Sequence, residues 1–346
     1  MNIYQYEYFN EYITIFMIAH LFEAIHKSLT GYLNIIEKSW ISIIISLSGL
    51  VLHIVLSYIF VILLEFGIFG AAIVVVIVNI SIVLTEFGYI LIFKPNPESF
   101  FFFTVESFDF NDLLDFMKYY LTILPIGISL FWSEEIQAIF AFTLGKFCMT
   151  SFVILQNIAS VLNFIICGSA IGASTCVGLF IGERKIHKIK VVLYIAIVFS
   201  NSLILLIIMF LVIFRNEILS GFINDKFILE YALTAFPAFC MFLILQTNSY
   251  LFEFFLRSCG YIMINIITQL FSYFVLMIGL SVIFTKILNL NVLGLWLSHD
   301  CAELTCLVVF VITYFVVDLE ASIIEIIKEE AKEQHSEEEE ATYLNS

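Results

Sequence analysis

Residues 41–64 read ISIIISLSGLVLHIVLSYIFVILL, a continuous run that contains no Asp, Glu, Lys or Arg. About 20 predominantly apolar residues suffice to cross the hydrocarbon core of a bilayer as an α-helix. The run is apolar on all sides and lacks the alternation of polar and apolar residues that a lipid-facing β-strand needs. It therefore predicts a transmembrane helix, and the rest of the chain repeats this pattern.

The composition points to the same class. Of the 346 residues, 62% are hydrophobic and only 13% are charged, and the mean hydropathy is +1.04. Soluble domains are about 45–50% apolar and about 25% charged, so a soluble, disordered or nucleic-acid-binding chain is excluded. The net charge of −15 is concentrated in residues 318–346, which hold ten acidic residues and two lysines. A further −3 lies in residues 94–118, so the charge describes a tail and a loop, and membrane lipid is the expected partner rather than nucleic acid.

Nine apolar segments predict an all-α membrane protein with about nine transmembrane helices. They span approximately residues 11–30, 40–63, 69–93, 119–143, 150–178, 190–214, 229–256, 262–285 and 292–317. The predicted organisation is a partial N-lobe of three helices at 1–93, a cytosolic linker at 94–118, a six-helix C-lobe at 119–317 and an acidic cytosolic tail at 318–346. Within the linker, residues 109–118 predict a short amphipathic helix.

An internal repeat relates the first three segments to the last three. A turn expected at Thr30-Gly31-Tyr32 corresponds to one at Arg257-Ser258-Cys259-Gly260, and FGIFGAAIV at 66–74 corresponds to NVLGLWLS at 291–298. The offset is about 224–227 residues throughout. Such repeats are a common construction in transporters. If the first lobe also has six helices, three more precede Met1, so the chain is expected to lack them.

Several segments, in order and spacing, resemble the multidrug and toxic compound extrusion (MATE) family. They are LFEAIHKSLTGYL at 21–33, LHI at 52–54, FGIFGAAIV at 66–74, WSEEIQAIFAFTLG at 132–145, QNIAS at 156–160, STCVGLFIGE at 174–183 and LRSCG at 256–260. The resemblance extends from about Leu21 to Val317. It implies a secondary antiporter that exports organic cations, drugs or metabolites in exchange for protons or sodium, in the plasma membrane or a vacuolar or vesicular membrane.

The chain departs from the family pattern at positions that bear on mechanism. The family helix around Trp132 usually carries two glutamates; the first falls on Leu130, and Glu135 fits the second. The acidic residue usual in the seventh segment of this chain falls on Gln246, and the family arginine falls on Cys176. The resemblance therefore transfers only part of the family's ionisable groups.

Glu134 and Glu135 are the main site candidates, because they lie in the middle of the fourth predicted span. An ionisable group at bilayer depth is costly unless it is paired, protonated or hydrated, and it marks a functional site by default. We expect Glu135 to bind the substrate or coupling ion, with Glu134, Asn157, Gln246 and Tyr273 as further lining residues. The alternative for these polar groups is hydrogen bonding between helices.

Other polar residues are expected to have structural roles and not to bind substrate or ions. Glu23 is expected to pair with His26 or Lys27 on its own helix. His299, Asp300 and Glu303, which begin the ninth span after Trp296, are expected to anchor that span at the membrane interface. We expect no metal site.

No enzyme activity or cofactor is expected, because the sequence contains no phosphate-binding G-x-x-x-x-G-K-[ST] loop and no orienting acid beside its Ser and His residues. Two alternatives to the antiporter stay open. One is a lipid or lipid-linked-sugar flippase of the same superfamily, which the lack of basic residues in mid-span disfavours. The other is a truncated, non-transporting paralogue, which Gln246 favours.

Lysines and arginines give the expected orientation, because they are enriched on the cytosolic side of membrane proteins. The densest group is GERKIHKIK at 182–190, between the fifth and sixth segments. Placing the tail in the cytosol puts this group and most other basic residues inside, and nine spans then put the N-terminus outside.

Overall fold

The computed structural model describes residues 3–96, 110–324 and 328, and among them it contains helices and short connections but no β-strand. Helices are expected for apolar segments in lipid, since lipid offers no partners for backbone N–H and C=O groups. The chain divides into two compact units, residues 1–109 and residues 110–346, which we call the N-unit and the C-unit.

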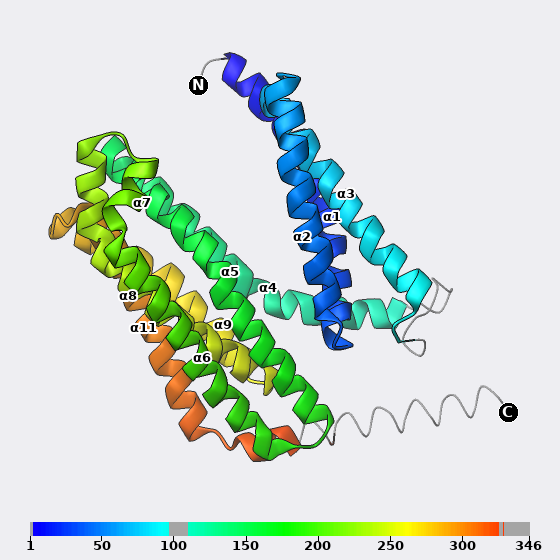
Figure 1. The fold of residues 1–346 in the computed structure, drawn as a ribbon. Coiled ribbons are helices and arrows are strands. Elements are labelled where there is room, and N and C mark those ends of the chain that lie inside the picture. The colour runs from blue at the N-terminus through cyan, green and yellow to red at the C-terminus, as the bar shows by residue number, and fades with distance from the viewer. Residues whose placement is uncertain (1–2, 97–109, 325–327, 329–346) are drawn as a thin grey trace. The chain divides into compact units, whose positions relative to one another are not determined.

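The N-unit is a bundle of three long helices. It comprises α1 (Ile3–Ile35), α2 (Ser39–Ser57), the π-helical segment η1 (Tyr58–Leu63) that continues α2, and α3 (Gly67–Phe93). α1 packs along α3, and α2 packs against both (Figure 1). A small apolar core of Leu33, Ile41, Ile45 and Ile90 holds the three helices together near one end.

The C-unit is a larger bundle in which α8 is the most buried helix, with α5, α6 and α11 packed around it (Figure 1). The tilted and edge-on rings of Phe152, Phe239 and Trp296 fill the core between α5, α8 and α11. Its elements are α4 (Phe110–Thr143), α5 (Lys146–Gly182), α6 (Ile186–Ile213), α7 (Arg215–Phe222), α8 (Lys226–Ser258), α9 (Ile262–Gln269), η4 (Leu270–Met277), α10 (Ile278–Val282), η5 (Ile283–Ile287) and α11 (Asn291–Val316).

The internal repeat is visible at two corners of the backbone, between η1 and α3 and between η5 and α11. Each corner closes with the same hydrogen bonds at residue numbers that differ by 224: Leu64 N to Ile59 O and Phe66 N to Phe60 O in the first, Leu288 N to Ile283 O and Leu290 N to Phe284 O in the second. The second landmark of the expected repeat, FGIFGAAIV with NVLGLWLS, is therefore confirmed in the backbone.

A glycine sits at the same place in each corner because no side chain fits there. A Cβ on Gly70 would lie 3.0 Å from the carbonyl oxygen of Phe60, and one on Gly294 would lie 3.1 Å from the carbonyl carbon of Phe284. Both approaches are to backbone atoms, which yield less readily than a flexible side chain. The two corners thus share a steric requirement as well as a bonding pattern.

In the part of the chain that the structure describes, eight segments are long and apolar enough to cross a membrane, and they coincide with the second to ninth predicted spans. They are Ser39–Leu63, Gly67–Phe93, Asp112–Thr143, Lys146–Gly182, Ile186–Ile213, Lys226–Ser258, Ile262–Ile287 and Asn291–Val316. α1 covers the first predicted span, 11–30, but polar residues such as Glu23 and His26 leave it less apolar than the other eight. The protein is thus a multi-pass, all-helical membrane protein.

Two predicted boundaries differ from the structure. The turn expected at Thr30-Gly31-Tyr32 lies inside α1, and the chain turns instead at residues 36–38, where Glu37 has a positive φ of 59°. Burial of Leu33, which is 0% exposed, favours continuing the helix past Gly31, whose cost in a helix is only about 1 kcal/mol. From residue 110, the amphipathic helix expected at 109–118 is the first part of α4. Most of the tail lies outside the described residues.

Candidate functional site

A buried glutamate lies in the interior of α11. Glu303 is 1% exposed, and the hydroxyl of Tyr273 in η4 donates a hydrogen bond of 2.6 Å to its Oε1 atom. Ser249 of α8 approaches the same carboxyl group. The Oε2 atom has no hydrogen-bond partner in the described part of the chain. A carboxyl group with one free oxygen in a membrane-embedded bundle is costly unless it takes up a proton or a cation.

A second buried glutamate, Glu253 of α8, has a basic partner. It is 2% exposed, and its Oε1 atom lies 3.7 Å from Nη1 of Arg257, one turn later on the same helix. The guanidinium group of Arg257 also packs over the ring of Phe254 at 4.1 Å. Glu253 is therefore compensated by a positive charge.

Tyr250 connects these glutamates to α4. Its side chain lies within electrostatic reach of Glu134, Glu253 and Glu303, and its hydroxyl accepts a hydrogen bond of 3.4 Å from Nε2 of Gln246. Groups from α4, α8, η4 and α11 thus gather in one region of the C-unit. We call Glu134, Glu253, Glu303, Tyr250 and Tyr273 the carboxyl cluster.

The five site residues expected from the sequence fall into two groups. Glu134, Gln246 and Tyr273 lie in or beside the carboxyl cluster, and Oε2 of Glu134 accepts a hydrogen bond of 3.1 Å from Nε2 of Gln156. Glu135 and Asn157 are exposed on α4 and α5. Since Gln156 precedes Asn157 and Glu134 precedes Glu135, the two exposed residues flank the contact between the two helices.

The interfacial role expected for His299, Asp300 and Glu303 is wrong. All three are buried in α11, where they are 3%, 8% and 1% exposed. The imidazole ring of His299 packs against the rings of Phe242 and Trp296, at centroid distances of 5.3 and 5.5 Å. The expectation rests on the commonness of His and Glu at helix ends, whereas these residues lie at least two turns inside α11.

Glu253, Glu303 and Glu86 are buried carboxyl groups that the sequence reasoning did not identify as site residues. The signal was available, because each lies in a long apolar segment, and an acid in that setting is a functional candidate by default. Among the described residues no group of three or more His, Cys, Asp and Glu side chains is arranged to hold a metal ion.

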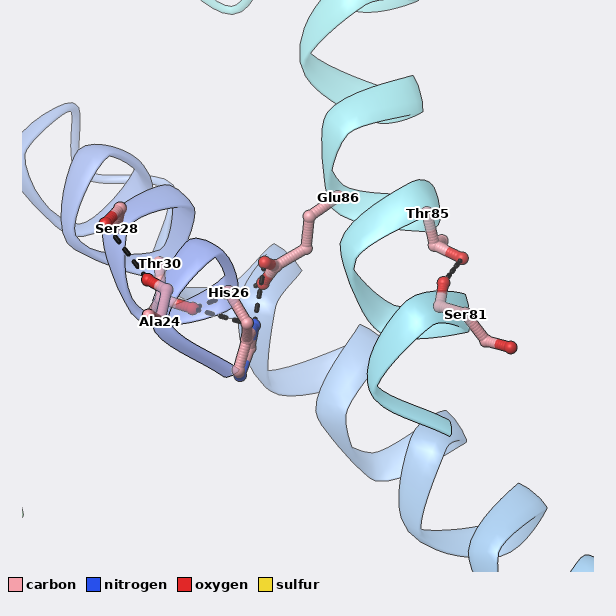
Figure 2. A network of polar contacts seen from close by, with 7 residues as sticks. All are labelled: Ala24, His26, Ser28, Thr30, Ser81, Thr85 and Glu86. Atoms are coloured by element: carbon pink, nitrogen blue, oxygen red, sulfur yellow. Dashed lines mark hydrogen bonds and ion pairs between the residues drawn. The ribbon is translucent and has the colours of Figure 1, made fainter. Parts of the chain in front are cut away.

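The N-unit has a polar centre of its own between α1 and α3 (Figure 2). Glu86 of α3 is 0% exposed; its Oε2 atom lies 2.8 Å from Nδ1 of His26, and its Oε1 atom accepts a hydrogen bond of 3.2 Å from Thr30. Figure 2 shows the side chains of His26 and Thr30 directed toward the carboxyl group. The hydroxyls of Ser81 and Thr85 instead donate hydrogen bonds to backbone carbonyls of α3. Both oxygens of Glu86 are therefore satisfied by α1.

The pairing expected for Glu23 is partly corrected by this network. Glu23 pairs with Lys27 at 2.8 Å, as expected, and also with His20 at 3.0 Å. His26 instead contacts Glu86, which is 60 residues away in the sequence. A local spacing rule cannot distinguish a partner on the same helix from one on a neighbouring helix.

One family model matches part of the chain. The MatE family model matches residues 125–283, which include most of the carboxyl cluster. A search of functionally curated proteins finds no significant match.

Solved structures match over most of the chain. The eukaryotic MATE transporter AtDTX14 is 17% identical, with a TM-score of 0.84 over 91% of this chain and 70% of that chain. An outward-facing multidrug resistance MATE family transporter of the MOP superfamily is 20% identical, with a TM-score of 0.73 over 90% and 69%. A MOP superfamily transporter from Pyrococcus furiosus is 19% identical, with a TM-score of 0.67 over 92% and 78%.

These matches agree with the resemblance found in the sequence motifs. At such low identity the solved structures establish the fold, and the family model adds the relationship over residues 125–283. The chain is therefore a multi-pass membrane protein with the fold of the MATE transporters, and its residues 125–283 match the MatE family model.

Proposed function

We propose that the chain is a secondary active antiporter that exports small organic cations, such as drugs or metabolites, in exchange for protons or sodium ions. The observation that carries this proposal is the carboxyl cluster within a MATE fold. Its three glutamates lie within electrostatic reach of Tyr250, and among the described residues its ion pair is that of Glu253 with Arg257. An excess of carboxyl groups at bilayer depth favours uptake of protons or cations, because uncompensated negative charge there is costly.

Within this proposal Glu135 supplies the counter-charge for the substrate. It is exposed on α4, beside Glu134, which is held by Gln156. Asn157 is exposed on α5 next to the same contact and can donate or accept hydrogen bonds. An organic cation near this surface would meet a carboxylate and an amide, while the buried glutamates exchange the coupling ion.

The cluster also bears on the alternative of a non-transporting paralogue. Gln246 occupies a position where the resemblance implies an acid, which removes one expected carboxyl group. Glu303 and Glu253 supply carboxyl groups in the same region, since both lie within electrostatic reach of Tyr250, the residue to which Gln246 is bonded. This favours a transporter in which the acidic function has moved to neighbouring positions.

Transport can be measured on the purified chain in proteoliposomes, by following uptake of a fluorescent organic cation under an imposed proton or sodium gradient. We expect uptake driven by one of the gradients and abolished in Glu135→Gln, because the variant loses its counter-charge. Glu23→Gln is the control and should have a smaller effect, since Glu23 pairs with His20 and Lys27. Wild-type rates in Glu135→Gln would remove Glu135 from the site. A chain that moves a fluorescent lipid instead would favour the flippase.

The orientation proposed for the chain places its tail in the cytosol. The basic residues near the helix ends favour this side. A reporter fused after Ser346 should read cytosolic, and a tag at Asn2 should read outside if α1 crosses the membrane together with the eight more apolar segments. Both ends on one side would mean that α1 does not cross.

A further inference from the structure

We propose that His26 and Glu86 form a proton-binding site in the N-unit, and that its protonation strengthens the contact between α1 and α3. The inference concerns a different unit from the carboxyl cluster, and it does not depend on the transport function proposed above.

The geometry of the carboxyl group carries the first step. Glu86 is fully buried, yet each of its oxygens faces a side chain of α1: Oε2 faces Nδ1 of His26 at 2.8 Å, and Oε1 faces Oγ1 of Thr30 at 3.2 Å (Figure 2). His26 and Thr30 are one turn apart, so they present both groups on one side of α1. The site is therefore built to hold a carboxylate.

The second step concerns the route of the proton. The side chain of Glu86 is 0% exposed, whereas that of His26 is 21% exposed. The Nδ1 atom of His26 is occupied by Glu86, which leaves Nε2 as the nitrogen that can exchange a proton with the surroundings. His26 thus connects a buried carboxylate to the outside of the bundle.

The third step is the effect of the proton on the contact. When Nε2 gains a proton the ring becomes an imidazolium cation, and the Nδ1–H donor forms a charge-assisted hydrogen bond with the Glu86 carboxylate. When Nε2 loses the proton, the neutral ring still donates from Nδ1 but the buried carboxylate has no counter-charge. Because His26 belongs to α1 and Glu86 to α3, protonation strengthens the contact between these helices.

Other titratable groups lie on each of the three helices around this site, and on α1 they include Tyr32, which has an interaction of its own. Glu23 and Lys27 on α1 pair with each other, and His20 pairs with Glu23. Tyr89 on α3 stacks on Phe93. α2 contributes His53, which is half-buried, and η1 contributes Tyr58, which is exposed. These groups define the controls for a test.

Amide hydrogen exchange with mass spectrometry tests the proposal on the full chain in nanodiscs, at pH 5.5 and pH 8.0. Protection factors, corrected for the intrinsic pH dependence of exchange, are followed in residues 22–34 of α1 and residues 80–92 of α3. In the wild type we expect protection in both segments to fall by about fivefold at the higher pH, the difference between a charge-assisted and a neutral hydrogen bond.

Variants test whether this pH dependence of protection arises from the contact between His26 and Glu86. His26→Gln, which retains a donor for Glu86, and Glu86→Gln should each remove the pH dependence in both segments. Glu23→Gln and His53→Gln should retain it, because they change an exposed pair and a histidine on another helix. If Glu86→Gln does not fold, His26→Gln alone decides the question. A pH-independent wild type, or wild-type behaviour in His26→Gln, would overturn the proposal.

Discussion

The corner that opens α3 and the corner that opens α11 have the same backbone but lead into helices with different polar centres. The hydrogen bonds and the glycine of the two corners match at an offset of 224 residues. Counted from these corners, Asn79 of α3 corresponds to Glu303 of α11, and Glu86 corresponds to Phe310. Each helix has a buried carboxyl group where its counterpart has none.

This difference teaches that the repeat preserves packing and not chemistry. Asn79 is half-buried and donates a hydrogen bond of 3.3 Å to the carbonyl oxygen of Ala19, whereas Glu303 is buried against Tyr273 with one oxygen free. Conversely, Phe310 is 0% exposed in an apolar core, while Glu86 is bound by His26 and Thr30. We therefore expect equivalent substitutions to have similar effects at the corners and different effects along the helices.

The largest expected difference is between Glu303→Gln and Asn79→Ala. The amide introduced by Glu303→Gln would still accept the hydrogen bond of Tyr273, but it cannot exchange a proton or balance a cation. Gradient-driven uptake should therefore fall by at least about tenfold, which corresponds to about 1.4 kcal/mol. Asn79→Ala removes one neutral hydrogen bond and should leave uptake nearly unchanged. The proteoliposome assay measures both.

The same pair of variants can contradict the assignment of function to the C-unit. Thermal unfolding should be measured alongside, because a loss of uptake counts only if Glu303→Gln remains folded. Undiminished uptake in a folded Glu303→Gln protein would mean that Glu303 only joins helices. A large loss in Asn79→Ala would mean that the N-unit position also serves transport.

The two corner glycines should respond alike. Gly70→Ala and Gly294→Ala each force a Cβ against the backbone of the preceding segment, at 3.0 Å from Phe60 O and 3.1 Å from Phe284 C. Overpacking of this kind typically costs about 1–3 kcal/mol. Gly88→Ala on α3 is the matched control, because nothing lies within 4 Å of its Cβ position. Thermal unfolding measures all three, and equal stability of Gly70→Ala and Gly88→Ala would contradict the steric account.

The smallest effect is expected at an exposed pair in the turn between α5 and α6. The hydrogen bond from Lys185 Nζ to Glu183, at 2.8 Å, lowers the pKa of the Glu183 carboxyl group. A lowered pKa stabilises the folded state above the pKa of the unfolded chain, and this stabilisation is lost as the pH falls. Because exposed ion pairs contribute little, Glu183→Gln should leave the unfolding temperature unchanged at pH 7 and at pH 4. A clear destabilisation at pH 7 only would show that the pair matters.

The candidate site was accessible from the sequence in part. Motifs and depth in a span indicate Glu134, Gln246 and Tyr273, which lie in or beside the carboxyl cluster. The same reasoning selects Glu135 and Asn157, and the roles of all five residues stay predictions. Glu303 is expected at the membrane interface because His and Glu are common at helix ends, whereas it lies at least two turns inside α11.

Local properties of the sequence determined that this is a helical membrane protein with an internal repeat. Hydropathy and the spacing of glycines are properties of the sequence along the chain. They can therefore be interpreted without knowing which helices pack together. The tertiary structure decided which carboxyl groups are buried and what satisfies them. Tyr273 and Glu303 are 30 residues apart, and His26 and Glu86 are 60 apart. Such pairs depend on which face each helix turns toward its neighbour, and in helices apolar on all sides that face is set by packing.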